Sequence, residues 1–166
     1  IVIASGSEVT PLPGVKIDEK KIISSTGALT LKKVPESMVV IGAGVIGLEM
    51  GSVWRRLGSK VTVIEFLDCV LPGMDSEISK QALRIFSKQG LEFKLSTKVT
   101  GAELSKNNVN LAIESVSGEK KETFDVDTVL VSIGRRPYIE GLGLKEIGVE
   151  ISERGFIKVN ENYQTN

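Results

Sequence analysis

The 166-residue sequence contains no histidine and a single cysteine, Cys69. The chain alone therefore offers no disulfide or dithiol, no Cys/His zinc site and no histidine for acid–base chemistry. Lysine and arginine together number 21, and so do aspartate and glutamate, which gives a net charge of zero. This balance argues against a nucleic-acid-binding or polybasic membrane-surface domain, because both need excess cations to meet phosphates.

Long hydrophobic runs are also missing, since none reaches the roughly 18–20 residues of a membrane-spanning helix. The composition, 41% hydrophobic and 25% charged, is that of an ordinary globular protein. At this length we expect one compact domain that buries roughly 70% of the surface of the unfolded chain. Residues 1–4 are apolar and indicate a buried strand. Because the sequence begins inside that strand without methionine, we expect a piece of a longer protein.

Residues 38–66 indicate a βαβ unit. Residues 38–41 form an apolar run with β-branched side chains, as in a strand buried on both faces. A glycine-rich turn, a helix that ends at Gly58 and a strand at 60–66 follow. Apolar residues recur along the helix at helical spacing, and we expect them to form its buried stripe: Ile46, Met50, Val53, Trp54 and Leu57.

The rest of the chain indicates further strands and helices. We expect short helical turns capped by residues 24–26, and a helix from Asp75 to Gly90. The stripe of that helix comprises Ile78, Ala82, Ile85, Phe86 and Gln89. Strands are expected at 91–95 and 126–133, and extended chain at 154–159, whereas residues 134–137 indicate a turn.

Between residues 95 and 126 the pattern changes from helical to short and alternating. Segments 99–104, 109–115 and 122–124, joined by Asn-Asn and Ser-Gly turn signals, indicate an antiparallel meander in place of a crossover helix. The predicted fold class is therefore α/β: a Rossmann-type FAD/NAD(P)-binding fold in which a parallel sheet carries an inserted three-stranded antiparallel β-meander.

A G-x-G-x-x-G motif connects the strand at 38–41 to the helix. Gly42 would let the chain turn sharply, Gly44 would let the backbone approach a pyrophosphate, and Gly47 would let the helix pack closely on the strand. Free amides and the dipole at the helix N-terminus would then face the phosphates. The alternative interpretation is a glycine turn that only packs a helix on a sheet.

Glu65 lies at the end of the next strand, 18 residues after Gly47. A dinucleotide site typically has an acidic residue about 20 residues after its glycine motif. Its carboxylate would accept hydrogen bonds from the hydroxyls of the adenosine ribose. Residues 66–69 contain no arginine or lysine that could pair with a 2′-phosphate, which a carboxylate would repel. We therefore expect a roughly tenfold or greater preference for NAD over NADP.

Segments 40–49, 51–58, 61–66 and 132–137 resemble the NAD-binding domain of the dihydrolipoamide dehydrogenase family, flavoprotein disulfide reductases of the class I pyridine nucleotide-disulfide oxidoreductases. The resemblance runs essentially end to end. It implies NAD-binding residues at Gly42, Ala43, Gly44, Val45, Ile46, Gly47, Leu48, Glu49, Glu65, Val99 and Gly134. It also implies that the turn Ser5, Gly6 and Ser7 touches FAD, although serine at position 5 replaces the family's usual threonine.

Several of these residues have equally ordinary interpretations. Glu49 can be a surface carboxylate of the helix, Val99 a core valine, and the turn at residues 5–7 a plain turn. Arg135 and Arg136 could hold a phosphate or a domain interface, or could serve only the structure. Cys69 lies in an expected loop without a partner thiol, and we assign it no redox role.

The resemblance implies a division of the chain into residues 1–10, the end of the flavin domain, 11–150, the NAD-binding domain, and 151–166, a return towards the flavin domain. It implies a homodimeric enzyme that oxidises the dihydrolipoamide of lipoyl domains in 2-oxo-acid dehydrogenase complexes. Electrons would pass through a redox disulfide and FAD to NAD, in the mitochondrial matrix or a bacterial cytoplasm. The redox cysteines and the catalytic histidine of that family lie outside this chain, so we expect the segment alone to be inactive, with no catalytic residue of its own.

Two alternatives stay open. The segment could belong to another disulfide reductase, similar to glutathione or mercuric reductase, because the disulfide substrate is bound largely outside it. It could instead be a non-catalytic NAD-sensing module, in which nucleotide binding shifts the interaction with a partner.

Overall fold

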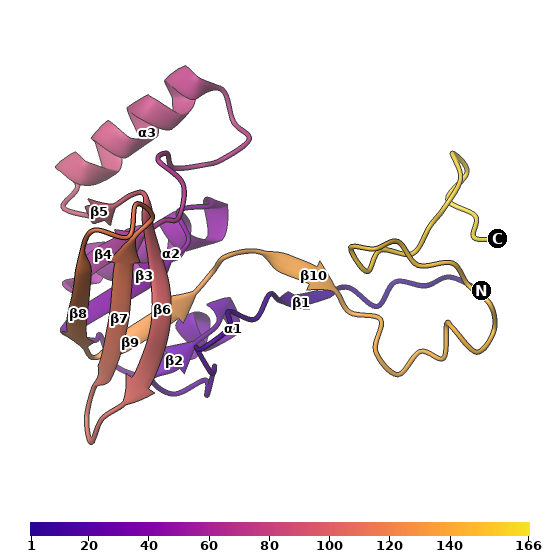
Figure 1. Ribbon diagram of the computed structural model, residues 1–166, viewed down its shortest axis with the longest axis horizontal. Coiled ribbons are helices and arrows are strands. Elements are labelled where there is room, and N and C mark those ends of the chain that lie inside the picture. The colour runs from indigo at the N-terminus through magenta and orange to yellow at the C-terminus, as the bar shows by residue number, and fades with distance from the viewer. The chain divides into compact units, whose positions relative to one another are not determined.

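The computed structural model describes residues 1–166 and resolves them into two compact units rather than one (Figure 1). The larger unit is Val9–Gly134, and the smaller combines Ile1–Glu8 with Arg135–Asn166. The sequence-based ranges 1–10, 11–150 and 151–166 describe domains of a longer protein and stay a prediction.

The larger unit is built on a five-stranded parallel sheet in the order β2-β9-β3-β4-β5. Strands β3 and β4 correspond to the two strands of the predicted βαβ unit. Strand β2 has only two residues, too few for a periodic signal, and the sequence did not predict it. The bounds are β2, Ile22–Ile23; β3, Ser37–Ile41; β4, Lys60–Ile64; β5, Glu92–Lys94; and β9, Thr128–Val131.

Three helices belong to this unit: α1, Ser25–Thr30; α2, Val45–Leu57; and α3, Ser76–Lys88. None is long and apolar enough to cross a membrane. The predicted cap of α1 is confirmed, since Ser24 Oγ accepts from the Thr26 amide. Asp75, where the sequence predicted the start of the second helix, is the N-cap of α3, and its Oδ1 accepts from the Glu77 amide. Gly58 ends α2 at φ +115°, the left-handed conformation that glycine adopts without strain.

The two faces of the sheet are buried by different layers, as the apolar strands predicted. On one face, Val40 and Val63 join a cluster with Leu48 and Trp54 of α2. On the other face, strand residues pack against a three-stranded antiparallel sheet whose side chains Val109, Leu111 and Ile113 are almost fully buried. That sheet is the predicted meander, with β6 at Thr97–Leu104, β7 at Val109–Ser115 and β8 at Lys121–Val126.

The predicted buried stripes of the helices are partly wrong. In α2, Val53 and Leu57 are about half exposed, and the residues that face the sheet are Gly47, Leu48, Gly51 and Trp54. The reason is that α2 packs its backbone on the sheet through glycines, which a hydropathy pattern does not register. In α3, Ile78 and Ile85 are likewise exposed, and the packed face contains Ser79, Ala82, Leu83 and Phe86.

The smaller unit also differs from the prediction. Residues 1–4 form no strand, and Ile1 and Val2 are exposed, because no strand of this chain pairs with them. Instead β1, Ser7–Val9, pairs with β10, Arg135–Pro137, where the sequence indicated a turn. The extended segment predicted at 154–159 contributes only a single bridge, between Ile151 and Ile157.

The turn that leads into β2 is held by one carboxylate. Asp18 Oδ1 accepts from the amides of Lys20, Lys21 and Ile22 at 2.8, 2.9 and 2.9 Å. Partial burial alone would raise the pKa of Asp18, but these backbone hydrogen bonds outweigh burial and bring the pKa below its ordinary value of 3.8. The ionised form is therefore favoured by folding.

Because the pKa of Asp18 is lower in the folded state, its contribution to stability is present above pH 3.8 and is lost as the pH falls through the lowered value. The substitution Asp18→Asn keeps an acceptor oxygen but removes the charge. We expect it to lower the free energy of unfolding by about 1 kcal/mol at neutral pH and by less in acid, measured by urea titration. Asp68→Asn, at an exposed carboxylate without hydrogen bonds, is the control. Equal losses at neutral and acidic pH would contradict this account.

Candidate nucleotide-binding site

The glycine motif lies where three parallel strands end side by side. Ile41 pairs in register with Ile64 on one side and with Val131 on the other. The amide of Gly42 donates to the carbonyl of Ile64 at 2.8 Å, and the amide of Ser132 donates to the carbonyl of Ile41 at 2.9 Å. The carboxyl ends of β3, β4 and β9 therefore meet at one edge of the sheet, the usual position of ligands in open α/β folds.

Two of the three motif glycines are required by contacts within the chain. Gly42 has φ +104°, and a Cβ there would lie 2.6 Å from the carbonyl oxygen of Ser132. A Cβ on Gly47 would lie 2.1 Å from the carbonyl oxygen of Gly42 and 2.7 Å from Ser132 Oγ. These contacts fit the predicted roles, a sharp turn at Gly42 and close helix packing at Gly47. Ser132, which meets both glycines, carries no motif signal, and the sequence did not single it out.

Gly44 differs from the other two. Its φ of −76° is open to any residue, and a Cβ there would meet no atom of the chain within 4 Å. Gly44 is the N-cap of α2, and no side chain caps this helix end. The first amides of the helix, from Val45 and Ile46, have no intrahelical partner and carry the positive end of the dipole. The chain thus presents amide donors beside open space, and no steric contact within the chain requires glycine at position 44.

Glu65 follows β4 directly and is half-buried beside this loop. Its Oε2 accepts from the amide of Ala43 at 2.7 Å, and its Oε1 accepts from the amide of Leu67 at 2.9 Å. The structure therefore brings the predicted acidic residue into direct contact with the glycine motif, which sequence spacing alone does not establish.

The remaining predicted residues are distributed around this centre. Val99 is half-buried in β6 and packs on the meander-side core, and two residues before it the amide of Thr97 donates to the Glu65 carbonyl at 2.9 Å. Leu48 is buried in the helix-side core, whereas Glu49 is exposed. Gly134 follows β9, and its carbonyl accepts from the amide of Thr10 at 3.0 Å. The nucleotide contacts of all these residues stay predictions.

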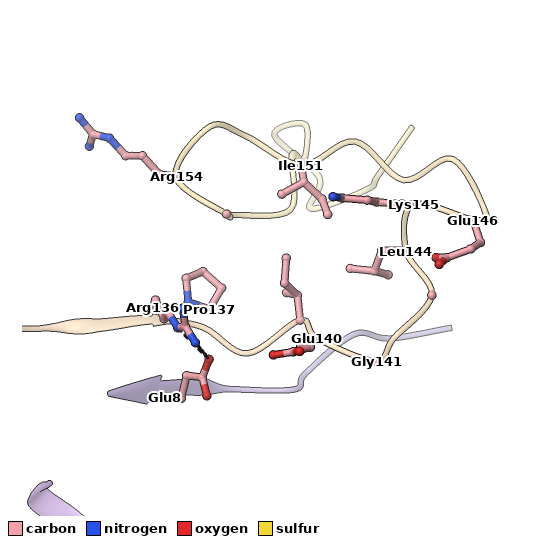
Figure 2. Close-up of a pocket in the computed structure, with 13 residues that line it drawn as sticks. Glu8, Arg136, Pro137, Glu140, Gly141, Leu144, Lys145, Glu146, Ile151 and Arg154 are labelled. Carbon is pink, nitrogen blue, oxygen red and sulfur yellow. Dashed lines mark hydrogen bonds and ion pairs between the residues drawn. The ribbon is translucent and has the colours of Figure 1, made fainter. Parts of the chain in front are cut away.

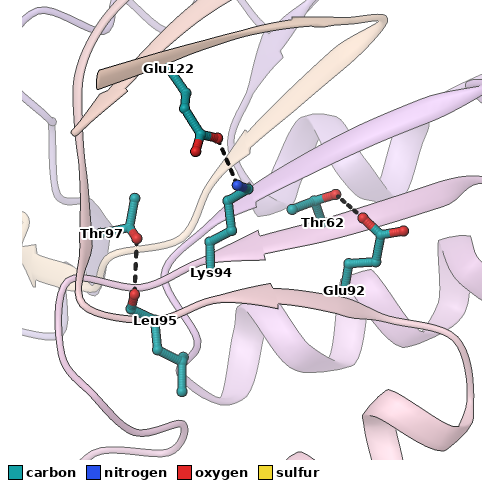
Figure 3. A network of polar contacts seen from close by, with 6 residues as sticks. All are labelled: Thr62, Glu92, Lys94, Leu95, Thr97 and Glu122. Atoms are coloured by element: carbon teal, nitrogen blue, oxygen red, sulfur yellow. Dashed lines mark hydrogen bonds and ion pairs between the residues drawn. The ribbon is translucent and has the colours of Figure 1, made fainter. Parts of the chain in front are cut away.

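Polar contacts fix the strands next to Glu65 (Figure 3). Lys94 Nζ lies 2.8 Å from Glu122 Oε2 and 5.0 Å from the ring centroid of Phe124. The hydrogen bond and charge of Lys94 lower the pKa of Glu122. Thr97 Oγ1 donates to the carbonyl of Leu95 at 2.9 Å, at the start of β6. These contacts join β5 to the meander. The ammonium group of Lys94 is paired with side chains of the meander, Glu122 and Phe124.

The smaller unit holds the predicted FAD-contacting turn. Gly6 has φ +78°, and the Arg135 guanidinium donates to Ser7 Oγ at 2.7 Å and to the Ser7 carbonyl. Arg136 pairs with Glu8 at 2.8 Å. Both arginines are therefore bound to β1. Of the roles considered from the sequence, these contacts fit the purely structural one. The contact of residues 5–7 with FAD stays a prediction.

The smaller unit has a cleft of about 640 Å³, which Arg136 lines together with Pro137 and residues of the following loops. Figure 2 shows these residues. Its lining includes Lys145 and Arg154 as well as Glu140 and Glu146, so charges of both signs are present. This mixture points to no particular ligand.

The sequence profile of the pyridine nucleotide-disulphide oxidoreductases matches residues 1–166. The chain belongs to this family. Members similar to it include dihydrolipoamide dehydrogenase of Chaetomium thermophilum, 57% identical over 99% of the chain, and the human mitochondrial dihydrolipoyl dehydrogenase, 59% identical over 99%. Among solved structures, the HOCl-induced flavoprotein disulfide reductase RclA of Escherichia coli superposes with a TM-score of 0.85 and 29% identity, covering 97% of this chain and 36% of that one.

The chain spans about a third of the length of its curated relatives, 33% in both cases given. Both the family and the likeness to solved reductases confirm the Rossmann-type fold class predicted from the sequence. About two thirds of each relative lie outside the region that this chain matches.

The contact between Gly47 and Gly42 predicts a sharp difference between two glycines of the same helix. Gly47→Ala should lower the free energy of unfolding by about 1–3 kcal/mol, because its Cβ would collide with backbone that cannot move aside. Gly51→Ala is the matched control, since its Cβ would make ordinary contacts at 3.5 Å with Leu91, Val40 and Val61. Chemical denaturation of both variants measures this, and equal effects would refute the proposed packing.

Proposed function

We propose that the chain is the NAD-binding segment of a flavoprotein that oxidises protein-bound dihydrolipoamide and passes the electrons through a redox disulfide and FAD to NAD. Family membership and the names of relatives at 57–59% identity support this assignment. The lower identity to the Escherichia coli reductase, 29%, favours it over another disulfide reductase of the same family. The proposal concerns the full-length protein, and this segment contributes the nucleotide site.

The single observation that carries the NAD site is the environment of Gly44. Its neighbours Gly42 and Gly47 are glycine because the chain leaves no room for a side chain, whereas position 44 faces open space. Glycine at position 44 would leave room for a ligand to approach the backbone closely, because it has no Cβ. A pyrophosphate is the group that suits this place, because the adjoining amides and helix dipole favour an anion.

The residues of the segment bind and orient the nucleotide. The amides of Gly44, Val45 and Ile46 would hold the pyrophosphate, and Glu65 the ribose hydroxyls. Val99 would provide an apolar wall for the adenosine, and Glu49, exposed just after the first turn of α2, would extend towards the nicotinamide. NAD supplies hydride acceptance when bound, and the segment's part in the reaction is to fix the position of the acceptor ring.

The remaining parts of the proposal rest on the relatives. We propose that FAD is held mainly by regions outside this chain, with residues 5–7 adding a contact. Lipoyl domains of 2-oxo-acid dehydrogenase complexes would be the partners of a homodimer. The human and Caenorhabditis elegans relatives are named as mitochondrial proteins, which supports a mitochondrial location for this protein.

Gly44→Ala tests the site separately from the fold. The added methyl group meets no protein atom, so we expect the free energy of unfolding to change by less than about 1 kcal/mol. NAD affinity of the full-length protein should fall roughly tenfold or more, because the methyl group occupies the path of the pyrophosphate. Calorimetric titration measures the affinity, and Gly101→Ala, in equally open space on β6, is the control. Unchanged NAD affinity in Gly44→Ala would contradict the assignment.

The surroundings of Glu65 predict cofactor choice. Residues 66–69 carry no cation, and Lys94 and Lys98 on the following strands are paired with Glu122 and Glu114. A 2′-phosphate would therefore meet a carboxylate without a compensating cation. We expect NADP to bind the full-length protein at least about tenfold more weakly than NAD in equilibrium titrations. Equal affinities would show that Glu65 does not face the ribose.

A further inference from the structure

The carboxylate of Glu65 is bound on both oxygens by the chain itself. The amide of Ala43, 22 positions earlier in the sequence, donates to Oε2 at 2.7 Å, and the amide of Leu67 donates to Oε1 at 2.9 Å. Both are charge-assisted hydrogen bonds, which are shorter and stronger than neutral ones. The side chain of Glu65 thus crosses from the end of β4 to the loop that follows β3.

Ala43 is held from its other side as well. Its carbonyl accepts from the amide of Leu71 at 2.9 Å, and its side chain is 0% exposed. Leu71 reaches this position with φ +50°, a left-handed conformation that a leucine adopts only when its surroundings impose it. Both polar backbone groups of Ala43 are therefore engaged within the chain, and both partners belong to residues 65–71, the connection after β4.

Ala43 directly precedes the amides that face the open space. Gly44 is the N-cap of α2, and Val45 begins the helix. The position of Ala43 therefore sets the direction in which the next amides point. Without its partner on Glu65, the amide of Ala43 would be a buried donor with no acceptor, and the loop would have to move to satisfy it.

We propose that Glu65 is a positioning residue for the pyrophosphate-binding loop, in addition to its role as acceptor for the ribose. Through Ala43 it holds the amides of Gly44 and Val45 in the arrangement that binds the pyrophosphate. This inference rests on the proposed NAD site and deepens it, because it makes Glu65 matter to a part of the nucleotide that its side chain does not touch. Ala43 then contributes to the site because the hydrogen bonds of its backbone to Glu65 and Leu71 hold the loop in place.

A nucleotide without the ribose hydroxyls separates the two roles. The probes are NAD and an NAD analogue whose adenosine ribose lacks the 2′ and 3′ hydroxyls, titrated calorimetrically into the full-length protein. The variant is Glu65→Gln, which can accept from only one of the two amides. Asp68→Asn, at an exposed carboxylate in the same connection, removes a charge without removing a hydrogen bond and controls for the weaker repulsion of the phosphates.

We expect Glu65→Gln to weaken the binding of the analogue about fivefold to tenfold relative to wild type, since one anchoring bond is lost. A residue that only contacts the ribose would leave analogue binding unchanged and weaken NAD alone, which would overturn the positioning role but leave the proposed function intact. If the wild type fails to bind NAD at all, the proposed function is wrong instead.

A measurement without nucleotide tests the anchor directly. The amide hydrogen of Ala43 should be protected from exchange in the wild type, and its exchange in Glu65→Ala, which removes both acceptor oxygens, should be at least about tenfold faster. The amide of Val40, inside the sheet, should exchange at the same rate in both proteins, which excludes a general loss of stability. Equal protection of Ala43 in both proteins would refute the anchor.

Discussion

The backbone contact between Gly47 and Gly42 sets the geometry of the larger unit. It seats the first turn of α2 against the loop that leaves β3, with Ser132 of the neighbouring chain segment filling the same corner. A side chain at position 47 would collide with the carbonyl of Gly42 and push the helix away from the loop, whereas one at position 42 would collide with the backbone of Ser132. Because glycine at position 47 allows this close packing, the N-terminal amides of the helix lie at the carboxyl edge of the sheet, where they can meet an anion. The fold and the site thus depend on one close approach.

The meander has a part in the site as well as in the core. A parallel sheet needs cover on both faces, and helices provide it on only one. The meander buries the other face with Val109, Leu111 and Ile113. Its first strand begins beside Glu65, because the amide of Thr97 donates to the Glu65 carbonyl. The element that replaces a crossover helix therefore also forms the wall on which the adenosine is proposed to rest.

Local patterns predicted the βαβ unit, the cap of α1, the end of α2 at Gly58 and the meander, because each depends on residues close in sequence. The failures involve partners that are distant or missing. Residues 1–4 are as apolar as a strand but have none to pair with, whereas Arg135–Pro137 pairs with β1 in spite of its charges. Val53 and Leu57 looked buried because apolar spacing does not show that Gly47 and Gly51 face the sheet. In the site, the motif identified the glycines and Glu65. Ser132 and Leu71 bond to that loop from distant parts of the chain, Ser132 through its hydroxyl and Leu71 through its amide, and neither belongs to the motif.

These backbone contacts bear on how the site would bind. A loop that must be ordered by its ligand lowers the affinity by the free energy of ordering. Here the loop is ordered by folding, since Gly42 bonds to β4, Ala43 bonds to Glu65 and Leu71, and the backbone of Gly47 lies close against the carbonyl of Gly42. Only Gly44 and the following amides are left without partners. The proposed dinucleotide site therefore relies on backbone amides and one carboxylate, and a chain without histidine and with one cysteine has the groups that such a site requires.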